Sequence, residues 1–150
     1  MSAVEGFVQK LLETKKRRDS QFIRIAQIVA ESATCNRLSV GAVITKGDRI
    51  LSTGFNTAPY GKPTCHDIGC LHDPQGRCKR TIHAEQMAII RAQEDLQDAT
   101  IYVSHFPCEN CANAILESGI THIVYLHDYE NLVSKEILKD MSMTQYTGGA

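Results

Sequence analysis

The sequence predicts one α/β domain in which helices cover a sheet whose later strands run parallel. The chain has 150 residues, 43% of them hydrophobic, which suits a single domain with one core. In its second half, helical patterns separate the strand-like segments, and parallel strands need such crossovers. Because no repeat or low-complexity linker divides the chain, we expect one domain over 1–150. Within it, 1–19 would form an N-terminal arm or helix and 56–80 a Cys-rich insertion loop.

The first half of the chain predicts a helix followed by a hairpin. Phe22–Ala33 carries apolar residues at helical spacing with one buried face. Val40–Thr45 and Ile50–Phe55 are rich in β-branched and apolar residues, and Lys46–Asp48 between them suits the turn of a hairpin. Residues 56–79 are rich in Gly, Pro, Asp, Cys and His without periodicity, so we expect a long loop with a function or a fixed anchor.

The second half alternates helices with strands. In order, the pattern predicts a helix over Ile82–Gln93, a strand over Thr100–Ser104, a helix over Cys108–Glu117, a strand over His122–Leu126 and a helix over Glu130–Lys139. Gly119 is the expected C-cap of the helix over Cys108–Glu117. The tail from Thr144 to Ala150 is expected to be frayed.

Charge and composition predict a cytoplasmic protein. The formal net charge is −1, so no global field favours nucleic acid or an anionic membrane. The first twenty residues lack the apolar region of a secretory signal, and no apolar run approaches the roughly 18 residues of a membrane span. The basic run Lys15–Ser20 is expected on a solvated helix face or N-terminal arm, with phosphate or nucleic-acid contact as the alternative. In a reducing compartment the six cysteines suit thiols or metal ligands better than a disulfide framework.

Cys108 and Cys111 form a C-x-x-C pair at the start of a predicted helix. Residues three apart share a helix face, so both sulfur atoms can reach one point. The positive end of the helix dipole favours thiolates, which bind metals, and Pro107 suits entry into the helix. A redox-active cysteine pair following a strand is the alternative.

His83 and Glu85 favour a metal site over a redox pair. His83 heads a second predicted helix, and one His with two Cys leaves the fourth zinc position open for water. Glu85 would transfer protons beside that water, although spacing two apart on an ideal helix does not by itself bring both side chains to one point. A closed structural zinc with His105 as fourth ligand is the alternative. H-x-E followed by P-C-x-x-C is the signature of zinc deaminases.

With these residues the chain resembles the cytidine/deoxycytidylate deaminase family, most of all the dCMP deaminases of the competence-operon and phage type. The resemblance covers 25–129 and includes the segments ATCNRLSVGAVI, RILSTGFNTAPYG, CKRTIHAEQMAI, IYVSHFPCENCANAILESGI and VYLHDY. It implies a three-layer α/β/α fold around a five-stranded mixed sheet, one catalytic zinc per subunit and homo-oligomers from dimer to hexamer. It implies hydrolysis of dCMP to dUMP and ammonia, which supplies thymidylate synthesis.

The resemblance also implies roles for individual residues. Glu85 would take the proton of the attacking water, protonate N3 of the cytosine and assist the departure of ammonia. The backbone N–H of Ala84 and the carbonyl of Ser104 would contact the base, and Asn56 the nucleoside. Arg37 would bind the 5′-phosphate through its guanidinium, with a surface salt bridge as the alternative.

Two further residues are candidate substrate contacts, and two positions depart from the family pattern. His105 and Tyr129 lie near the expected pocket, with an ordinary loop histidine and a half-buried tyrosine as the alternatives. The chain has Gly-Phe-Asn-Thr at 54–57 where the family often has Gly-Tyr-Asn-Gly. Met87 stands where the family often has Asn.

The remaining cysteines suggest a second, structural zinc. They are Cys35, Cys65, Cys70 and Cys78. Some relatives in the family tie this insertion to the first helix with a zinc bound at the places of Cys35 and Cys65. Four thiolates would close a tetrahedral site and order a loop that has no core of its own. His66 and His72 are competing ligands, and free or buried thiols are the alternative.

The resemblance leaves the exact substrate open. Alternatives to dCMP are dCTP, deoxycytidine or a base in tRNA, and a non-catalytic zinc-binding module is a further class. The net charge of −1 argues against a grip on a tRNA backbone. A Mg²⁺ ion accompanying an allosteric dCTP or dTTP effector is the remaining implied cofactor.

Overall fold

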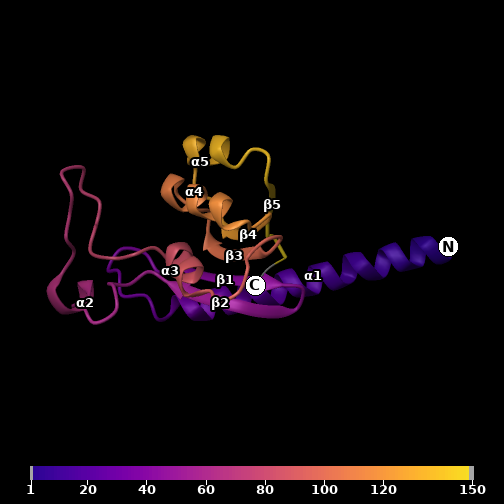
Figure 1. Cartoon of the computed structure of the whole chain (residues 1–150), viewed down its shortest axis with the longest axis horizontal. Helices are drawn as coiled ribbons and strands as arrows, with labels where there is room; N and C mark the ends of the chain where they lie inside the picture. The colour runs from indigo at the N-terminus through magenta and orange to yellow at the C-terminus, as the bar shows by residue number, and fades with distance from the viewer. Residues whose placement is uncertain (1, 149–150) are drawn as a thin grey trace.

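The structure is a computed structural model that describes residues 2–148 (Figure 1). The helices are α1 (Ala3–Ala30), α2 (Cys65–Ile68), α3 (Ala84–Arg91), α4 (Glu109–Ser118) and α5 (Leu132–Ile137). The strands are β1 (Gly41–Lys46), β2 (Arg49–Phe55), β3 (Thr100–His105), β4 (His122–His127) and β5 (Ser142–Gln145). Apart from the short α2 and the last strand β5, this order follows the alternation that the sequence predicts.

The five strands form one mixed sheet in the order β2-β1-β3-β4-β5. β1 pairs antiparallel with both β2 and β3, and the β1–β2 hairpin turns at Gly47, whose φ of +61° suits glycine. β3, β4 and β5 pair in parallel, because α4 and α5 carry the chain back across the sheet between them. The predicted mixed sheet with parallel later strands is therefore confirmed.

Side chains that alternate along the strands divide the interior into two cores. Val43 of β1 faces α1 and packs in a cluster with Phe22 and Ala26, whereas its neighbours Ala42 and Ile44 point to the opposite face. The cluster on that opposite face also includes Ala84 and Ala88 of α3 and Ala112 and Ile115 of α4. Helices thus cover both faces of the sheet, in the three-layer arrangement expected from the sequence.

Two glycines let helices lie directly on the sheet. A Cβ atom at Gly41 would lie 1.9 Å from the carbonyl oxygen of Ala26 in α1. A Cβ atom at Gly54 would lie 2.1 Å from the carbonyl oxygen of Ala84 in α3. The close contact at Gly54 sets the height of the start of α3 above the sheet, which matters for the site described below.

The two ends of the chain differ in how they compare with the sequence pattern. Residues 3–19, expected as an arm or helix, join the helix predicted from Phe22 into one α1 from Ala3 to Ala30, and its first half extends away from the sheet (Figure 1). Thr144 and Gln145 belong to β5 and pair with β4 instead of fraying, because the parallel edge of β4 offers them backbone partners. The last two residues of the expected frayed tail lie outside the described residues. Within 2–148, no helix is both long and apolar enough to cross a membrane.

Candidate active site

The starts of two neighbouring helices carry the predicted metal ligands. His83 is the N-cap of α3 and Cys108 is the N-cap of α4, so both side chains project from helix ends rather than from helix faces. The side-chain Oε1 of Gln86 accepts a hydrogen bond from the backbone N–H of His83 at 3.1 Å, which fixes the first turn of α3. Sequence reasoning did not single out Gln86, although a Gln three residues after a cap is a recognised signal.

Three ligand atoms converge between these helix starts. Nδ1 of His83 lies 3.4 Å from Sγ of Cys108 and 3.3 Å from Sγ of Cys111, and the ligand atoms all lie within 4.8 Å of one another. Around a tetrahedral zinc, with bonds of about 2.0–2.1 Å to nitrogen and 2.3 Å to sulfur, N and S ligands are about 3.5 Å apart. The donor set and its spacing therefore fit a zinc ion that has one position left for another ligand.

Glu85 reaches the same site. His83 has an extended backbone, with φ −80° and ψ 154°, whereas Glu85 lies inside the first turn of α3. This change of backbone conformation removes the divergence expected for two positions on an ideal helix. The carboxyl group of Glu85 is hydrogen-bonded to the Cys111 side chain, and Glu85 is only 4% exposed.

The electrostatics of the cluster suit proton transfer. Burial raises the pKa of Glu85 to about 7, so this carboxyl can both accept and release a proton near neutral pH. Hydrogen bonds from Cys111 and from the His83 ring lower the pKa of Cys108 to about 4, which favours the thiolate that metals bind.

Asn56 and Ser104 lie buried beside this region and hold the chain before β1. Oδ1 of Asn56 accepts the N–H of Val40 at 2.8 Å, and its Nδ2 donates to the carbonyl of Leu38 at 2.7 Å. Oγ of Ser104 accepts the N–H of Gly41 at 3.0 Å. The side chain of Asn56 thus fixes the segment that follows Arg37, which itself is exposed.

His105 and Tyr129 occupy the carboxyl ends of neighbouring strands. Nδ1 of His105 lies 2.9 Å from Oγ of Ser104, and its ring packs at 4.8 Å between centroids against His127. His127 lies opposite His105 in the parallel β3–β4 register, a relationship that only the register reveals. Tyr129 is 46% exposed, and Nδ2 of Asn131 donates to its hydroxyl at 3.4 Å.

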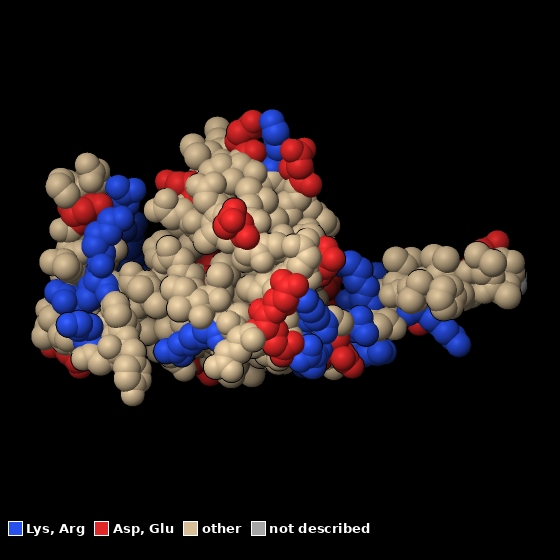
Figure 2. Space-filling view, viewed as in Figure 1, with Lys and Arg blue, Asp and Glu red and all other residues tan. Residues whose placement is uncertain are grey.

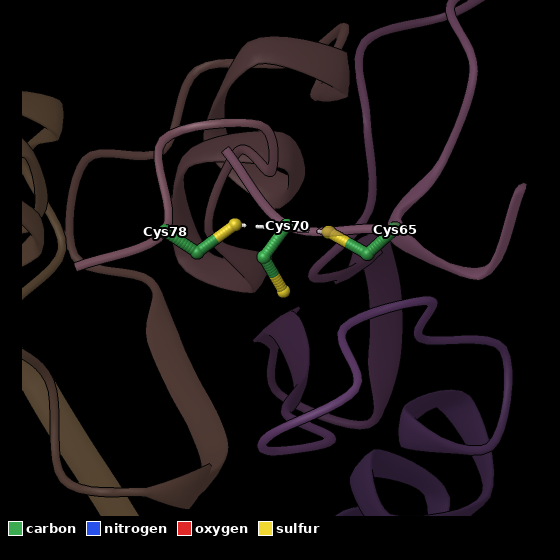
Figure 3. Close-up of side chains that lie close together, drawn as sticks. All are labelled: Cys65, Cys70 and Cys78. Carbon is green, nitrogen blue, oxygen red and sulfur yellow. Dashed lines mark hydrogen bonds between the residues drawn. The ribbon is translucent and has the colours of Figure 1, made fainter. Parts of the chain in front are cut away.

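A second group of ligand atoms lies in the Cys-rich insertion. Figure 3 shows Cys65 and Cys78 approaching from opposite sides with Cys70 between them, and their sulfur atoms all lie within 4.8 Å of one another. Sγ of Cys65 lies 3.7 Å from Sγ of Cys78, close to the roughly 3.8 Å expected between two thiolates on one tetrahedral zinc. Cys35, also predicted as a ligand, lies outside this group, and its sulfur accepts the N–H of Arg37 at 3.4 Å.

Comparison with known proteins identifies the family of the chain. The family model described as "Cytidine and deoxycytidylate deaminase zinc-binding region" matches residues 16–127. ComE operon protein 2 of Bacillus subtilis is 38% identical over 112 residues, covering 73% of this chain and 59% of that protein. The deoxycytidylate deaminase of Mycobacterium phage D29 is 36% identical over 119 residues, covering 71% of this chain and 92% of that enzyme.

A solved structure shares the architecture. The dCMP deaminase of cyanophage S-TIM5, in complex with dCMP and dUMP, matches with a TM-score of 0.74 and 22% identity, covering 85% of this chain and 95% of that chain. This chain spans about three-fifths of the Bacillus protein and nearly all of the phage D29 enzyme. Because the family model covers residues 16–127, most of the chain, the chain belongs to the cytidine and deoxycytidylate deaminase family, whose model is described as a zinc-binding region.

Proposed function

We propose that the protein is a zinc-dependent hydrolase that converts dCMP to dUMP and ammonia. The observation that carries the proposal is the meeting of His83, Cys108 and Cys111 around one point, with the buried carboxyl of Glu85 beside them. Relatives named deoxycytidylate deaminase supply the substrate class, among them the enzyme of Mycobacterium phage D29.

The residues of the site suit each proton movement in this hydrolysis. A zinc bound by His83, Cys108 and Cys111 would lower the pKa of water and so supply a hydroxide nucleophile near neutral pH. Glu85 would accept the proton that the water loses and deliver it to N3 of the cytosine. Glu85 would next accept the proton of the hydroxyl group added at C4 and pass it to the amino group, so that the C4–N bond breaks, ammonia leaves and the C4 carbonyl of dUMP forms; a carboxyl with a pKa of about 7 suits both transfers.

The surroundings suggest how a nucleotide would be held. At the start of α3, the N–H of Ala84 would contact the base. Near the end of β3, the carbonyl of Ser104 would contact it as well. Asn56 would act largely by holding the 38–40 segment, since its amide already bonds Val40 and Leu38. This segment follows Arg37, whose exposed guanidinium would be free to contact a 5′-phosphate. His105 and Tyr129 would line the remaining wall.

Ammonia release from a substrate panel tests the proposal. The panel contains dCMP, dCTP, deoxycytidine, cytidine and a tRNA anticodon stem, with zinc per chain counted on the same protein. We expect turnover of dCMP above that of the other substrates. Turnover of dCTP or deoxycytidine alone would change the substrate, whereas bound zinc without turnover of any free nucleotide would favour the RNA or structural alternatives.

We also propose a second, structural zinc bound by Cys65, Cys70 and Cys78. The support is the 3.7 Å separation of the Cys65 and Cys78 sulfur atoms and the lack of a hydrophobic core in the surrounding insertion. A metal there would stabilise this segment because its ligands come from three places along it. Protein with this site filled would carry two zinc ions per chain, and one zinc per chain would contradict the proposal.

The rest of the proposal rests on membership of the family. It comprises a homo-oligomer, a cytoplasmic location and regulation by dCTP or dTTP together with Mg²⁺. Initial rates with dCMP, measured with and without dCTP·Mg²⁺ and dTTP·Mg²⁺, would test the regulation. Opposite effects of the two nucleotides would support it, and rates unchanged by both would remove it.

A further inference from the structure

The first half of α1 extends beyond the sheet with one apolar face uncovered. Figure 1 shows this segment leaving the body, and the side chains from Phe7 to Glu13 are all exposed. The apolar stripe consists of Val4, Phe7, Val8, Leu11 and Leu12. Phe7 is 63% exposed and Leu11 54% exposed, a large apolar surface for one helix to present to water.

The stripe continues the face by which α1 packs on the sheet. Its spacing of three and four residues runs on through Lys15 to the buried residues Asp19, Phe22 and Ala26. Inside the body this face is covered by β1, β3 and β4, but beyond the body nothing in residues 2–148 covers it. An isolated helix of about 16 residues is only marginally stable in water, so a partner for this face would stabilise the segment.

The charges on α1 favour a second copy of the same helix in antiparallel orientation. Glu5 lies near the free end, and the basic segment Lys15–Arg18 lies where the helix meets the body. Figure 2 shows this distribution: the projecting half is mostly uncharged in this view, and basic side chains gather at its base. Antiparallel pairing brings Glu5 of each copy towards the basic segment of the other, whereas parallel pairing would set the two basic segments against each other.

The geometry of one helix fits this two-fold pairing. Glu5 and Lys16 are eleven residues apart, about three turns, so they lie on the same side of the stripe. In an antiparallel pair, the side of one helix that carries Glu5 and Lys16 faces the same side of the other helix. Val8 of one copy then meets Leu11 of the partner subunit. The two projecting segments, about 24 Å long each, overlap while the two bodies stay at opposite ends.

A hollow at the base of α1 would receive the end of the second helix. It has a volume of about 310 Å³, and its lining includes Leu11, Thr14, Lys15 and Arg18. Asp19 also lines the hollow and pairs with Lys15 at 2.8 Å, so Arg18 is the basic side chain that would face the acidic first turn carrying Glu5. The family model begins to match at residue 16, so the whole stripe lies before the matched region.

We propose that the projecting half of α1 is a dimerisation element that pairs antiparallel with the same segment of a second copy. The contact is isologous, so each copy contributes both the apolar stripe and the basic base. It is separate from the candidate active site and does not depend on the proposed deamination.

The first test places charges on the stripe of the full chain. We expect Val8→Glu/Leu11→Glu to raise the dissociation constant of the dimer at least tenfold, measured by sedimentation equilibrium over a range of concentrations. Gln9→Glu/Lys10→Gln changes the net charge equally on the opposite side of the same segment, and should leave that constant within twofold. An unchanged constant in the stripe variant, or an equal rise in both variants, would overturn the proposal.

The second test reverses one pair of charges. Glu5→Lys and Lys16→Glu should each weaken the dimer, and the double variant should restore most of the loss. Glu5 and Lys16 are too far apart to pair within one helix, so restoration requires pairing between copies in the antiparallel orientation. Absence of restoration overturns that orientation.

A membrane surface is the alternative occupant of an apolar stripe with a basic base. Sedimentation with vesicles of phosphatidylcholine and phosphatidylserine separates the two. We expect the wild-type chain to remain in the supernatant. Binding to these vesicles by a chain that stays monomeric in solution would replace the dimer by a membrane contact.

Discussion

The Sγ atom of Cys111 lies 3.3 Å from Nδ1 of His83, although 28 positions separate the two residues. The contact exists because α3 and α4 lie side by side on one face of the sheet and begin near each other. Each helix supplies a ligand from its N-cap, His83 for α3 and Cys108 for α4, and both caps have extended backbone. Four predictions follow from this arrangement and from the packing that supports it.

Replacing Glu85 by Gln should reduce dCMP turnover by about a hundredfold or more while the zinc content stays unchanged. An amide cannot accept and release the proton as a carboxyl does, and acid–base groups contribute about 10²–10⁴-fold to rates. Ammonia release and metal analysis on the same preparation check this. Glu94→Gln is the control, since Glu94 is exposed and pairs with Arg49. Turnover retained in Glu85→Gln would remove Glu85 from the mechanism.

Adding one methyl group at Gly54 should destabilise the fold by about 1–3 kcal/mol, as overpacking in a well-packed interior does. The new Cβ would lie 2.1 Å from the carbonyl oxygen of Ala84, so α3 must move away from β2. Because Ala84 and Glu85 open α3, activity should fall as well. Denaturant unfolding of Gly54→Ala beside Thr53→Ala measures the effect. Equal stability of the two variants would show that α3 is free to shift.

Serine in place of Cys78 should remove one of two zinc ions and lower the melting temperature. The thiolate is lost from the three-sulfur group, and the energy with which a metal binds a structural site contributes directly to folding. Cys35→Ser is the matched variant and should keep both ions, since Cys35 lies outside that group. Loss of one zinc from Cys35→Ser would instead make Cys35 a ligand, as the sequence suggested.

His122 should make the protein less stable in mild acid. Its partial burial, with a smaller effect from Lys15, lowers its pKa in the folded state below the usual value. The unfolded chain therefore binds a proton first as the pH falls, so the stabilisation is present above about pH 6.5 and is lost as the pH drops through the folded pKa. The change in urea midpoint between pH 7.5 and 5.5 should be smaller in His122→Gln than in the wild type.

If the urea midpoint changed by the same amount in the wild type and in His122→Gln, the His122 prediction would be contradicted. His105 also has a lowered pKa, because of burial and the neighbouring His127, and acts in the same direction. It is present in both proteins, so its contribution cancels from the comparison.

The elements most accurately predicted were those with strong local patterns. The hairpin at 40–55 and the helix ended by Gly119 match the structure within a few residues, because β-branched runs and a left-handed C-cap are local signals. β5 was missed because Ser142–Gln145 is short and polar, and it is a strand only through its pairing with β4. For 1–19 the sequence left an arm and a helix open, because the apolar stripe there has no core to pack against within the described residues.

The sequence by itself determined which residue types the candidate site contains and in what order: a His and a Glu opening one helix and a Cys pair opening the next. Only the tertiary structure decided which of them meet. Glu85 converges with His83 because His83 lies in extended backbone before the helix, and Cys35 lies apart from the three cysteines with which it was grouped. Local periodicity is set by neighbours along the chain, whereas distances between remote atoms depend on strand register and on close packing such as that of Gly54 against α3.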